Sequence, residues 1–234
     1  RNGQYQRSQQ CYTKALQSHP DNPAYHYNLG ITYIHTEQYE SAIKCLEYAA
    51  KLQPNLEGVL SDLCFAYERA NNFEAAIMAG EKALIQSPDN ANAHFHLALA
   101  YHGWKDFNAS FKHHLKACQL SPDSPELLYE LGNAYFGRNE LEAAKQCYLR
   151  LLQLVPEHFL ALYSLVSCTR YSTIDHDDLR WLKMLEKKEN LTDEDRTPVF
   201  FALAKLYQDC ELHDKAFCYF ERGNALQAKT HPFS

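Results

Sequence analysis

The sequence contains few of the residues that interrupt helices, with 8 glycines and 9 prolines among 234 residues. It has no low-complexity stretch, and no apolar run approaches the roughly 20 residues that a membrane-spanning helix needs. No signal peptide is visible at its beginning. These absences predict a chain that is ordered throughout, and we expect no membrane among its partners.

The short motifs of catalysis are missing as well. There is no GxxxxGK phosphate loop, no GxGxxG, no GxSxG and no HExxH zinc motif. Histidines two apart, such as His94 and His96, point to different faces of a helix. Asp175, Asp177 and Asp178 lack the glycine and the distal glutamate of a calcium loop. We therefore predict no catalytic residue, no metal, no cofactor and no enzymatic activity in this chain.

The charge balance argues against nucleic acid as a partner. Lysine and arginine number 23 against 29 aspartates and glutamates, which gives a formal net charge of −6. Nucleic-acid-binding domains are typically basic, and no basic stripe is present. A mildly acidic chain is better suited to neutral or basic protein segments.

What the sequence does contain is a strict repeat of 34 residues. A fixed period of this length predicts an array of one supersecondary unit instead of a single globular core. Four kinds of position recur in phase: Pro20, Pro54, Pro88, Pro122 and Pro156; Leu29, Leu63, Leu97 and Leu131; Tyr33, Tyr67, Tyr101 and Tyr135; and Ala15, Ala49, Ala83 and Ala117.

Each unit divides into two apolar stripes at helical spacing. In the first unit, one helix begins near Pro23, a break follows at residues 35–38, and a second helix buries Ala42 and Leu46. The proline after the second helix ends it, and a residue such as Asn22 caps the next one.

Close approach of the two helices is predicted at one repeat position. Small residues (Gly30, Cys64, Ala98 and Gly132) follow the repeated leucine. Gly80 stands where other units have Leu46 or Tyr148. Either a neighbouring ring fills the gap or a pocket opens there, and we expect it to be filled.

These positions resemble the tetratricopeptide repeat, a helix-turn-helix unit. The resemblance implies an all-α fold, a right-handed α-α superhelix of stacked antiparallel helix pairs whose first helices line a concave face. We expect residues 1–22 to be the second helix of a truncated repeat, which suggests a chain cut from a longer protein. Residues 23–158 would form four regular units, 159–196 a degenerate repeat or linker, and 197–234 a final unit and tail.

The last part of the chain carries a second resemblance. The runs Phe201-Ala202-Leu203-Ala204-Lys205 and Ala216-Phe217, with Gly223-Asn224-Ala225, resemble the last repeat of bacterial proteins that join tetratricopeptide repeats to a sulfotransferase domain. The irregular segment before Trp181 is similar to their linker repeat. This resemblance implies substrate recruitment for a catalytic domain that would follow Ser234. Thr192 and Asp195 predict a capping box for the first helix of this unit.

The eight cysteines are predicted to be structural. Cys11, Cys45 and Cys147 share one repeat position, Cys64 lies at a small-residue position, and no CxxC pair exists. Buried cysteine behaves as a small hydrophobe. This pattern favours a reducing, cytoplasmic location.

By resemblance to peptide-binding members of the family, one set of positions on the first helices faces the groove. The predicted peptide-binding residues are Tyr27, Asn28, Ile31, Asp62, Phe65, Arg69, Phe95, His96, Leu99, Tyr129, Glu130 and Asn133. Tyr27, Phe65, Phe95 and Tyr129 are assigned to the fifth position of each unit. Either they fill the crevices between units or they form an exposed apolar track for a peptide.

Other groove residues narrow the choice of ligand class. Asn28 and Asn133 resemble the asparagines that bind peptide backbone in the solenoid of O-linked N-acetylglucosamine transferase, but two do not make a ladder. The lysines of chaperone-tail adaptors are absent, and the acids Asp62 and Glu130 would repel a terminal carboxylate. We predict a non-catalytic module that binds a protein or peptide segment. The alternatives are the sulfotransferase region named above and self-association through the ends of the stack.

Overall fold

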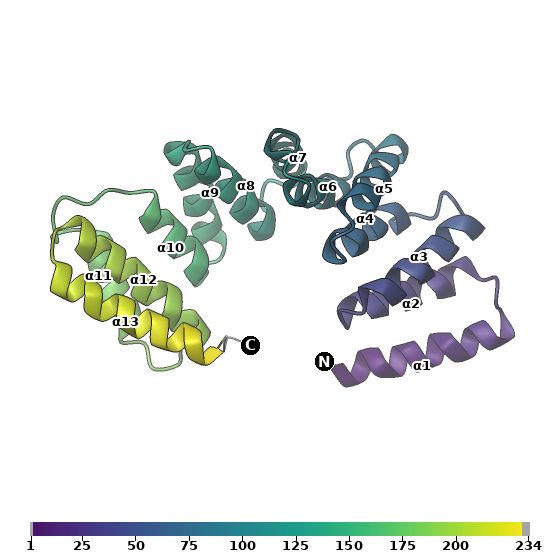
Figure 1. Ribbon diagram of the computed structural model, residues 1–234, viewed down its shortest axis with the longest axis horizontal. Helices are drawn as coiled ribbons and strands as arrows, with labels where there is room; N and C mark the ends of the chain where they lie inside the picture. The colour runs from purple at the N-terminus through teal and green to yellow at the C-terminus, as the bar shows by residue number, and fades with distance from the viewer. Residues whose placement is uncertain (1, 231–234) are drawn as a thin grey trace. The chain divides into compact units, whose positions relative to one another are not determined.

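The computed structural model describes residues 2–230, and in this range it consists of helices without a strand (Figure 1). The helices are α1 (Asn2–Ser18), α2 (Pro23–His35), α3 (Tyr39–Leu52), α4 (Val59–Arg69), α5 (Phe73–Gln86), α6 (Ala91–Gly103), α7 (Phe107–Leu120), α8 (Pro125–Gly137), α9 (Leu141–Leu154), α10 (Phe159–Ser167), α11 (Asp177–Glu186), α12 (Asp193–Asp209) and α13 (His213–Thr230). The predicted all-α solenoid of helix pairs is confirmed.

The chain forms two compact units, Arg1–Pro122 with α1 to α7 and Asp123–Ser234 with α8 to α13. In the first unit α2 packs on α3, α4 on α5, and α6 on α7, while α3 and α5 also contact the first helix of the following repeat. Helix α1 packs on α2 in the manner of a second helix. There, Tyr5 stacks on His35 with ring centroids 4.7 Å apart, and Gln9 donates a hydrogen bond to the Thr36 hydroxyl.

Helix boundaries follow the predicted signals. The second helices α3, α5, α7 and α9 all end two residues before a proline of the 34-residue series, as does α1. Asn22 and Asn90 cap α2 and α6, because each side-chain oxygen accepts a hydrogen bond from a backbone N–H of the first turn. The capping box of Thr192 and Asp195 is present at the start of α12. These sequence predictions are confirmed.

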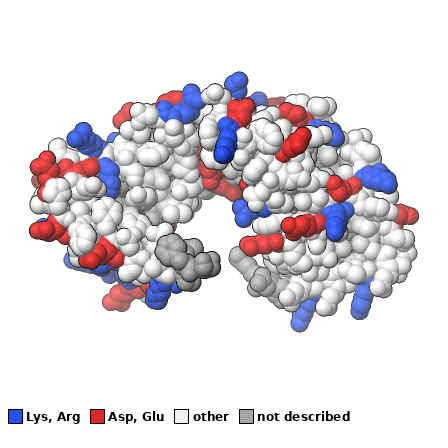
Figure 2. All heavy atoms as spheres, in the orientation of Figure 1, with Lys and Arg blue, Asp and Glu red and all other residues white. Residues whose placement is uncertain are grey.

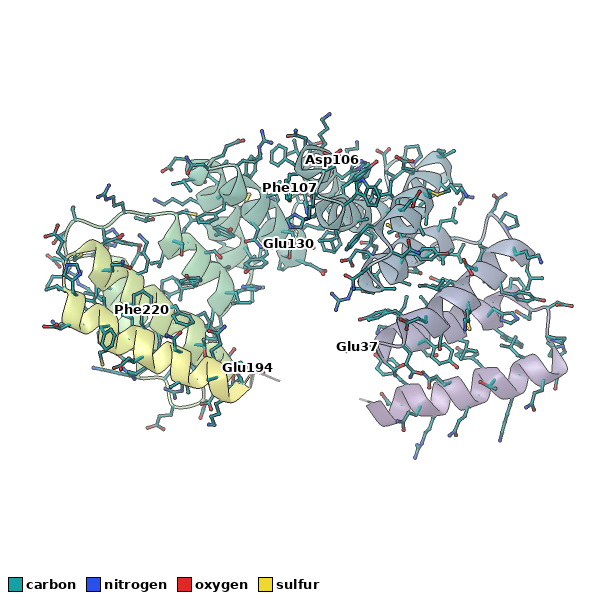
Figure 3. All side chains as sticks on the ribbon, viewed as in Figure 1. Glu37, Asp106, Phe107, Glu130, Glu194 and Phe220 are labelled. Carbon is teal, nitrogen blue, oxygen red and sulfur yellow. The ribbon has the colours of Figure 1, made fainter. Side chains whose placement is uncertain are left out.

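The turn inside each hairpin has one conformation. Glu37, Asn71, Lys105, Asn139 and Glu211 all have φ between 57° and 67°. At the first of these turns, the Gln38 N–H donates to the Tyr33 carbonyl and the Glu37 N–H to the Ile34 carbonyl, which is the Schellman arrangement. The same pair of bonds recurs at the other four turns. Figure 3 labels Glu37 at the α2–α3 turn.

Hairpins close tightly where a small residue faces a large one. A Cβ on Gly132 would lie 2.5 Å from a ring carbon of Tyr148, and one on Gly30 would lie 2.8 Å from Leu46. In the second repeat the glycine lies on the second helix instead. There, Cys64 and Leu97 fill the space beside Gly80. The gap is filled and no pocket opens there, but the prediction that a ring fills it is wrong.

Helices α10 and α11 lie within residues 159–196, but they are not paired like a regular hairpin. Helix α10 packs on α9 and α12, whereas α11 packs on α12. The connection between them contains the buried Tyr171, whose backbone N–H donates to Asp209 of α12 (3.0 Å). Lys205 pairs with the same carboxylate. This segment is therefore held by α12.

The cysteines match the structural prediction in part. All eight are free thiols. Cys64, Cys118 and Cys168 are buried, whereas Cys11 and Cys218 are exposed on α1 and α13. The packing interpretation is therefore wrong for the last two.

Candidate peptide-binding surface

The first helices α2, α4 and α6 of the first unit contact one another in sequence and carry most of the predicted site residues. We call the side of these three helices that bears the predicted residues the first-helix face. In the second unit, α8 carries Tyr129, Glu130 and Asn133 (Figure 3 labels Glu130).

Tyr27 and Asp62 join α2 to α4. The phenolic hydroxyl of Tyr27 donates a 2.7 Å hydrogen bond to the Asp62 carboxylate. Burial raises the pKa of the Asp62 carboxyl, while the bond from Tyr27 acts in the opposite direction. The same burial and hydrogen bond raise the pKa of Tyr27 above its ordinary range. Both predicted residues are thus used in contacts between repeats.

Phe65 and Arg69 lie over the α2–α3 turn and the next repeat. The Phe65 ring is 4.9 Å from His96 and 6.4 Å from Tyr39, measured between centroids. The Arg69 guanidinium lies 5.5 Å from the centre of the Tyr39 ring and donates a 3.3 Å hydrogen bond to its hydroxyl. Arg69 itself is exposed, so its guanidinium remains within reach of a ligand.

Phe95 and His96 are packed into the stack. Phe95 is 6% exposed, and its ring lies 6.1 Å from His114. Burial lowers the pKa of His96 to about 4, and the same cause lowers that of His114 to about 4. The Nδ1 atoms of both histidines are buried without a hydrogen-bond partner among the described residues. Both histidines are therefore neutral near pH 7.

In the second unit, two predicted residues also have internal partners. The Tyr148 hydroxyl donates a 2.8 Å hydrogen bond to the Asn133 side-chain oxygen. The Tyr129 ring lies 5.2 Å from His158 and 6.2 Å from Tyr148. Binding of a peptide backbone by Asn133 would have to compete with the bond from Tyr148.

The register assignment of Phe65 is wrong. The residue 34 positions after Tyr27 is Ser61, and Phe65 lies one helical turn further along α4. Tyr27, Phe95 and Tyr129 do share the fifth position. Tyr27 and Tyr129 are half-buried and contact the next repeat, whereas Phe95 is buried with its ring near His114 of its own hairpin. For Tyr27 and Tyr129 these contacts favour crevice filling over an exposed track.

On the first-helix face Arg69 is exposed, and Asn28, Ile31 and Leu99 are half-buried and remain accessible. Glu68 adds a carboxylate whose Oε2 atom is buried and has no hydrogen-bond partner within residues 2–230. Burial raises the pKa of this carboxyl, while the charge of Arg69 acts in the opposite direction. Glu68 belongs to the groove positions of the second repeat, but its unpaired oxygen depends on the packing around it and is not readable from the sequence.

Neither the distribution of charge nor the placement of possible metal ligands points to a further site among the described residues. On the face shown in Figure 2, acidic and basic side chains alternate and neither sign forms one continuous patch. Among the described residues, no group of three or more histidine, cysteine, aspartate or glutamate side chains is placed to hold a metal ion. Within the same residues, no helix has both the length and the apolar character to cross a bilayer.

Comparison with known families agrees with this geometry. Three family models, all described as tetratricopeptide repeat, match residues 1–58, 66–125 and 125–158. This chain belongs to the tetratricopeptide repeat family. The comparison with curated proteins finds no match.

Several solved structures share the fold. PilF of Pseudomonas aeruginosa has a TM-score of 0.68 at 17% identity, with 91% of this chain and 93% of that chain covered. The C-terminal part of a TPR repeat-containing protein from Cytophaga hutchinsonii has a TM-score of 0.67 at 14% identity, with coverage of 99% and 93%. YrrB, described as a TPR protein with an unusual peptide-binding site, has a TM-score of 0.57 at 15% identity, with coverage of 90% and 97%.

Proposed function

We propose that this tetratricopeptide repeat chain is a non-catalytic module that binds a protein segment along its first-helix face. The main support is a division of roles among the predicted residues. Tyr27 and Tyr129 contact the next repeat, whereas Asn28 on α2 and Leu99 on α6 are only half-buried.

The chemistry of this face favours a basic segment. Glu68 has a carboxylate oxygen without a partner among residues 2–230, and Asp62 lies on the same helix. A lysine or arginine side chain would supply the missing hydrogen-bond donor. Ile31 on α2 and Leu99 on α6 are half-buried and add apolar area to the same face. The description of YrrB as a protein with a peptide-binding site is in keeping with such a role, although the shared fold alone does not transfer it.

Fluorescence anisotropy with labelled lysine-rich peptides tests the proposal. We expect Glu68→Gln to weaken binding about tenfold, which corresponds to about 1.4 kcal/mol. Glu74→Gln on α5 is the matched control, because Glu74 is exposed on a second helix. Equal affinities of wild type and Glu68→Gln would refute the role of this face. Charge reversal at Glu130 tests the α8 residues of the second unit in the same assay.

Two finer predictions accompany this one. Recruitment of substrate for a sulfotransferase domain is tested by the reading frame after Ser234, where a glycine-rich phosphate loop is expected and an early stop codon would end the idea. Self-association through the ends of the stack is tested by light scattering over a range of concentrations, where a constant monomeric mass would exclude it. A cytoplasmic location remains a prediction from the cysteines.

A further inference from the structure

One position of the first helix carries an aromatic ring in every repeat but one. It lies two residues before the repeated leucine, which continues as Leu165 in α10 and Leu203 in α12. The residues at this position are Tyr27, Ser61, Phe95, Tyr129, Tyr163 and Phe201. The second repeat, α4 and α5, therefore lacks the ring that its neighbours have.

The rings show where the missing one would lie. Tyr27 packs with Leu56 against the core of the first unit and reaches Asp62 of the next first helix. Tyr129 contacts His158, the residue that caps the following first helix. In both repeats the ring thus occupies a space between its own hairpin and the start of the next repeat, which we call the ring seat.

In the second repeat the ring seat is a cavity. A cavity of about 420 Å³ is lined by Gly58, Leu60 and Ser61 of α4 and its N-cap, by Gln86 of α5, and by Asn90. Asn90 is the counterpart of Leu56 and His158 in the 34-residue period. The cavity therefore coincides with the space that a ring fills in the first and fourth repeats.

The cavity contains polar groups that lack partners. Ser61 is 5% exposed, and its Oγ atom has no hydrogen-bond partner among the described residues. Gly58 is the N-cap of α4 and has no side chain to accept from the first N–H groups of the helix. Glu57 lies exposed at the same cavity and disfavours an anion there. A neutral ring that carries a hydroxyl group matches this combination.

We propose that this cavity binds the side chain of a tyrosine from a partner segment. The ring would replace the aromatic residue that Ser61 does not supply, and its hydroxyl would pair with Ser61 Oγ or accept from a backbone N–H in the first turn of α4. This proposal rests on the proposed function in one respect, since the tyrosine belongs to the bound segment. The cavity itself is tested without a peptide.

The first experiment uses N-acetyl-tyrosinamide as the probe and amide-detected NMR of the whole chain as the measurement. We expect shifts confined to the neighbourhood of Leu60, Ser61 and Asn90, with a Kd on the order of 1 mM, as is usual for a ligand of this size. Ser61→Ala should weaken the probe about fivefold but leave N-acetyl-phenylalaninamide unchanged. Absence of shifts at these residues at about 10 mM probe would overturn the proposal.

The second experiment fills the ring seat from within. Ser61→Tyr restores the side chain of the first repeat, and its hydroxyl would be directed toward His96, the counterpart of Asp62, whose Nδ1 lacks a partner. We expect Ser61→Tyr to melt higher than Ser61→Phe and to lose the probe. Probe binding by Ser61→Tyr at the wild-type affinity would contradict the assignment, and if Ser61→Tyr does not fold, the Ser61→Ala result decides.

The two proposals fail separately. Probe binding at Ser61 with no effect of Glu68→Gln on lysine peptides would retain the cavity and refute the basic-segment function. An effect of Glu68→Gln with no probe binding at Ser61 would do the reverse.

Discussion

The regular hairpins and the α10–α11 segment differ in their packing, and the difference identifies what a hairpin requires. In α8 and α9, Gly132 lets the two backbones approach, and Asn139 takes the left-handed conformation at the turn. The counterparts 34 residues later are Val166 and Thr173. A valine occupies the space of close approach, and a β-branched residue is strongly disfavoured at positive φ. Without these two features, α10 and α11 pack on other helices.

The largest effect is expected from Gly132→Ala. The new Cβ would lie 2.5 Å from the ring of Tyr148, which is 1% exposed and has little room to move. We expect a loss of about 3 kcal/mol in the free energy of unfolding. Gly137→Ala is the control, because a Cβ there meets nothing within 4 Å. It should change stability by less than about 1 kcal/mol and toward greater stability. Urea denaturation measures both, and similar losses would show that hairpin closure is not decided at Gly132.

Asp209→Asn tests whether Asp209 of α12 holds the connection between α10 and α11. Asp209 accepts a hydrogen bond from the Tyr171 N–H and pairs with Lys205, both partly buried. Leaving Lys205 without its carboxylate should cost about 2 kcal/mol. Hydrogen exchange is expected to increase in residues 168–176 before it does in α8 and α9. The exposed Asp214→Asn is the control, and equal exchange in both variants would contradict the anchoring role.

Acidification should lower the stability of the two units over different pH ranges. His96 and His114 have folded pKa values lowered to about 4 by burial, so the unfolded chain binds more protons as the pH falls from about 6.5. Stability of the first unit should therefore drop between about pH 6.5 and 4, by up to about 1.4 kcal/mol per pH unit for each histidine.

The second unit has linkage of the same sign, but in a lower pH window, because it comes from a carboxyl whose folded pKa is lowered. Burial raises the pKa of Glu186, but hydrogen bonds from Arg222, Lys183 and Tyr219 outweigh it and lower the value. That contribution is present above the carboxyl's unfolded pKa and is lost as the pH falls through the folded value. Hydrogen exchange over a pH series measures both units, and His114→Leu should flatten the dependence of the first. Parallel loss in both units above pH 5 would contradict this difference.

The smallest effect concerns the turn residues. Lys105 has φ of 67°, which costs a non-glycine residue part of its stability. Lys105→Gly should stabilise the chain by about 0.5–1 kcal/mol. Asn139→Gly should gain less, since asparagine tolerates this conformation. Thermal denaturation compares the two, and a destabilising Lys105→Gly would show that the lysine side chain has a further role.

Much of the fold was predictable because its signals are local. Asn22 and Asn90 are typical N-cap residues, prolines follow the helix ends, and the turn length follows from the period. The site was predictable only as a set of positions. Whether Phe95 faces a ligand or a crevice depends on how closely the next repeat packs, and the bond from Tyr148 to Asn133 depends on a residue 15 positions away. The period alone shows that Ser61 stands where other repeats have a ring. The wrong assignment of Phe65 to that position hid this absence.

The sequence by itself determined that this protein is a stack of helix hairpins without catalytic motifs, because helix propensity, capping and a 34-residue period act over short distances. The tertiary structure decided which side chains remain available. Burial left Glu68 Oε2 and Ser61 Oγ without partners among the described residues, and it turned the rings of Tyr27, Phe95 and Tyr129 inward. Those outcomes depend on the fit between neighbouring repeats, since the free energy of a polar atom is set by whatever surrounds it after folding.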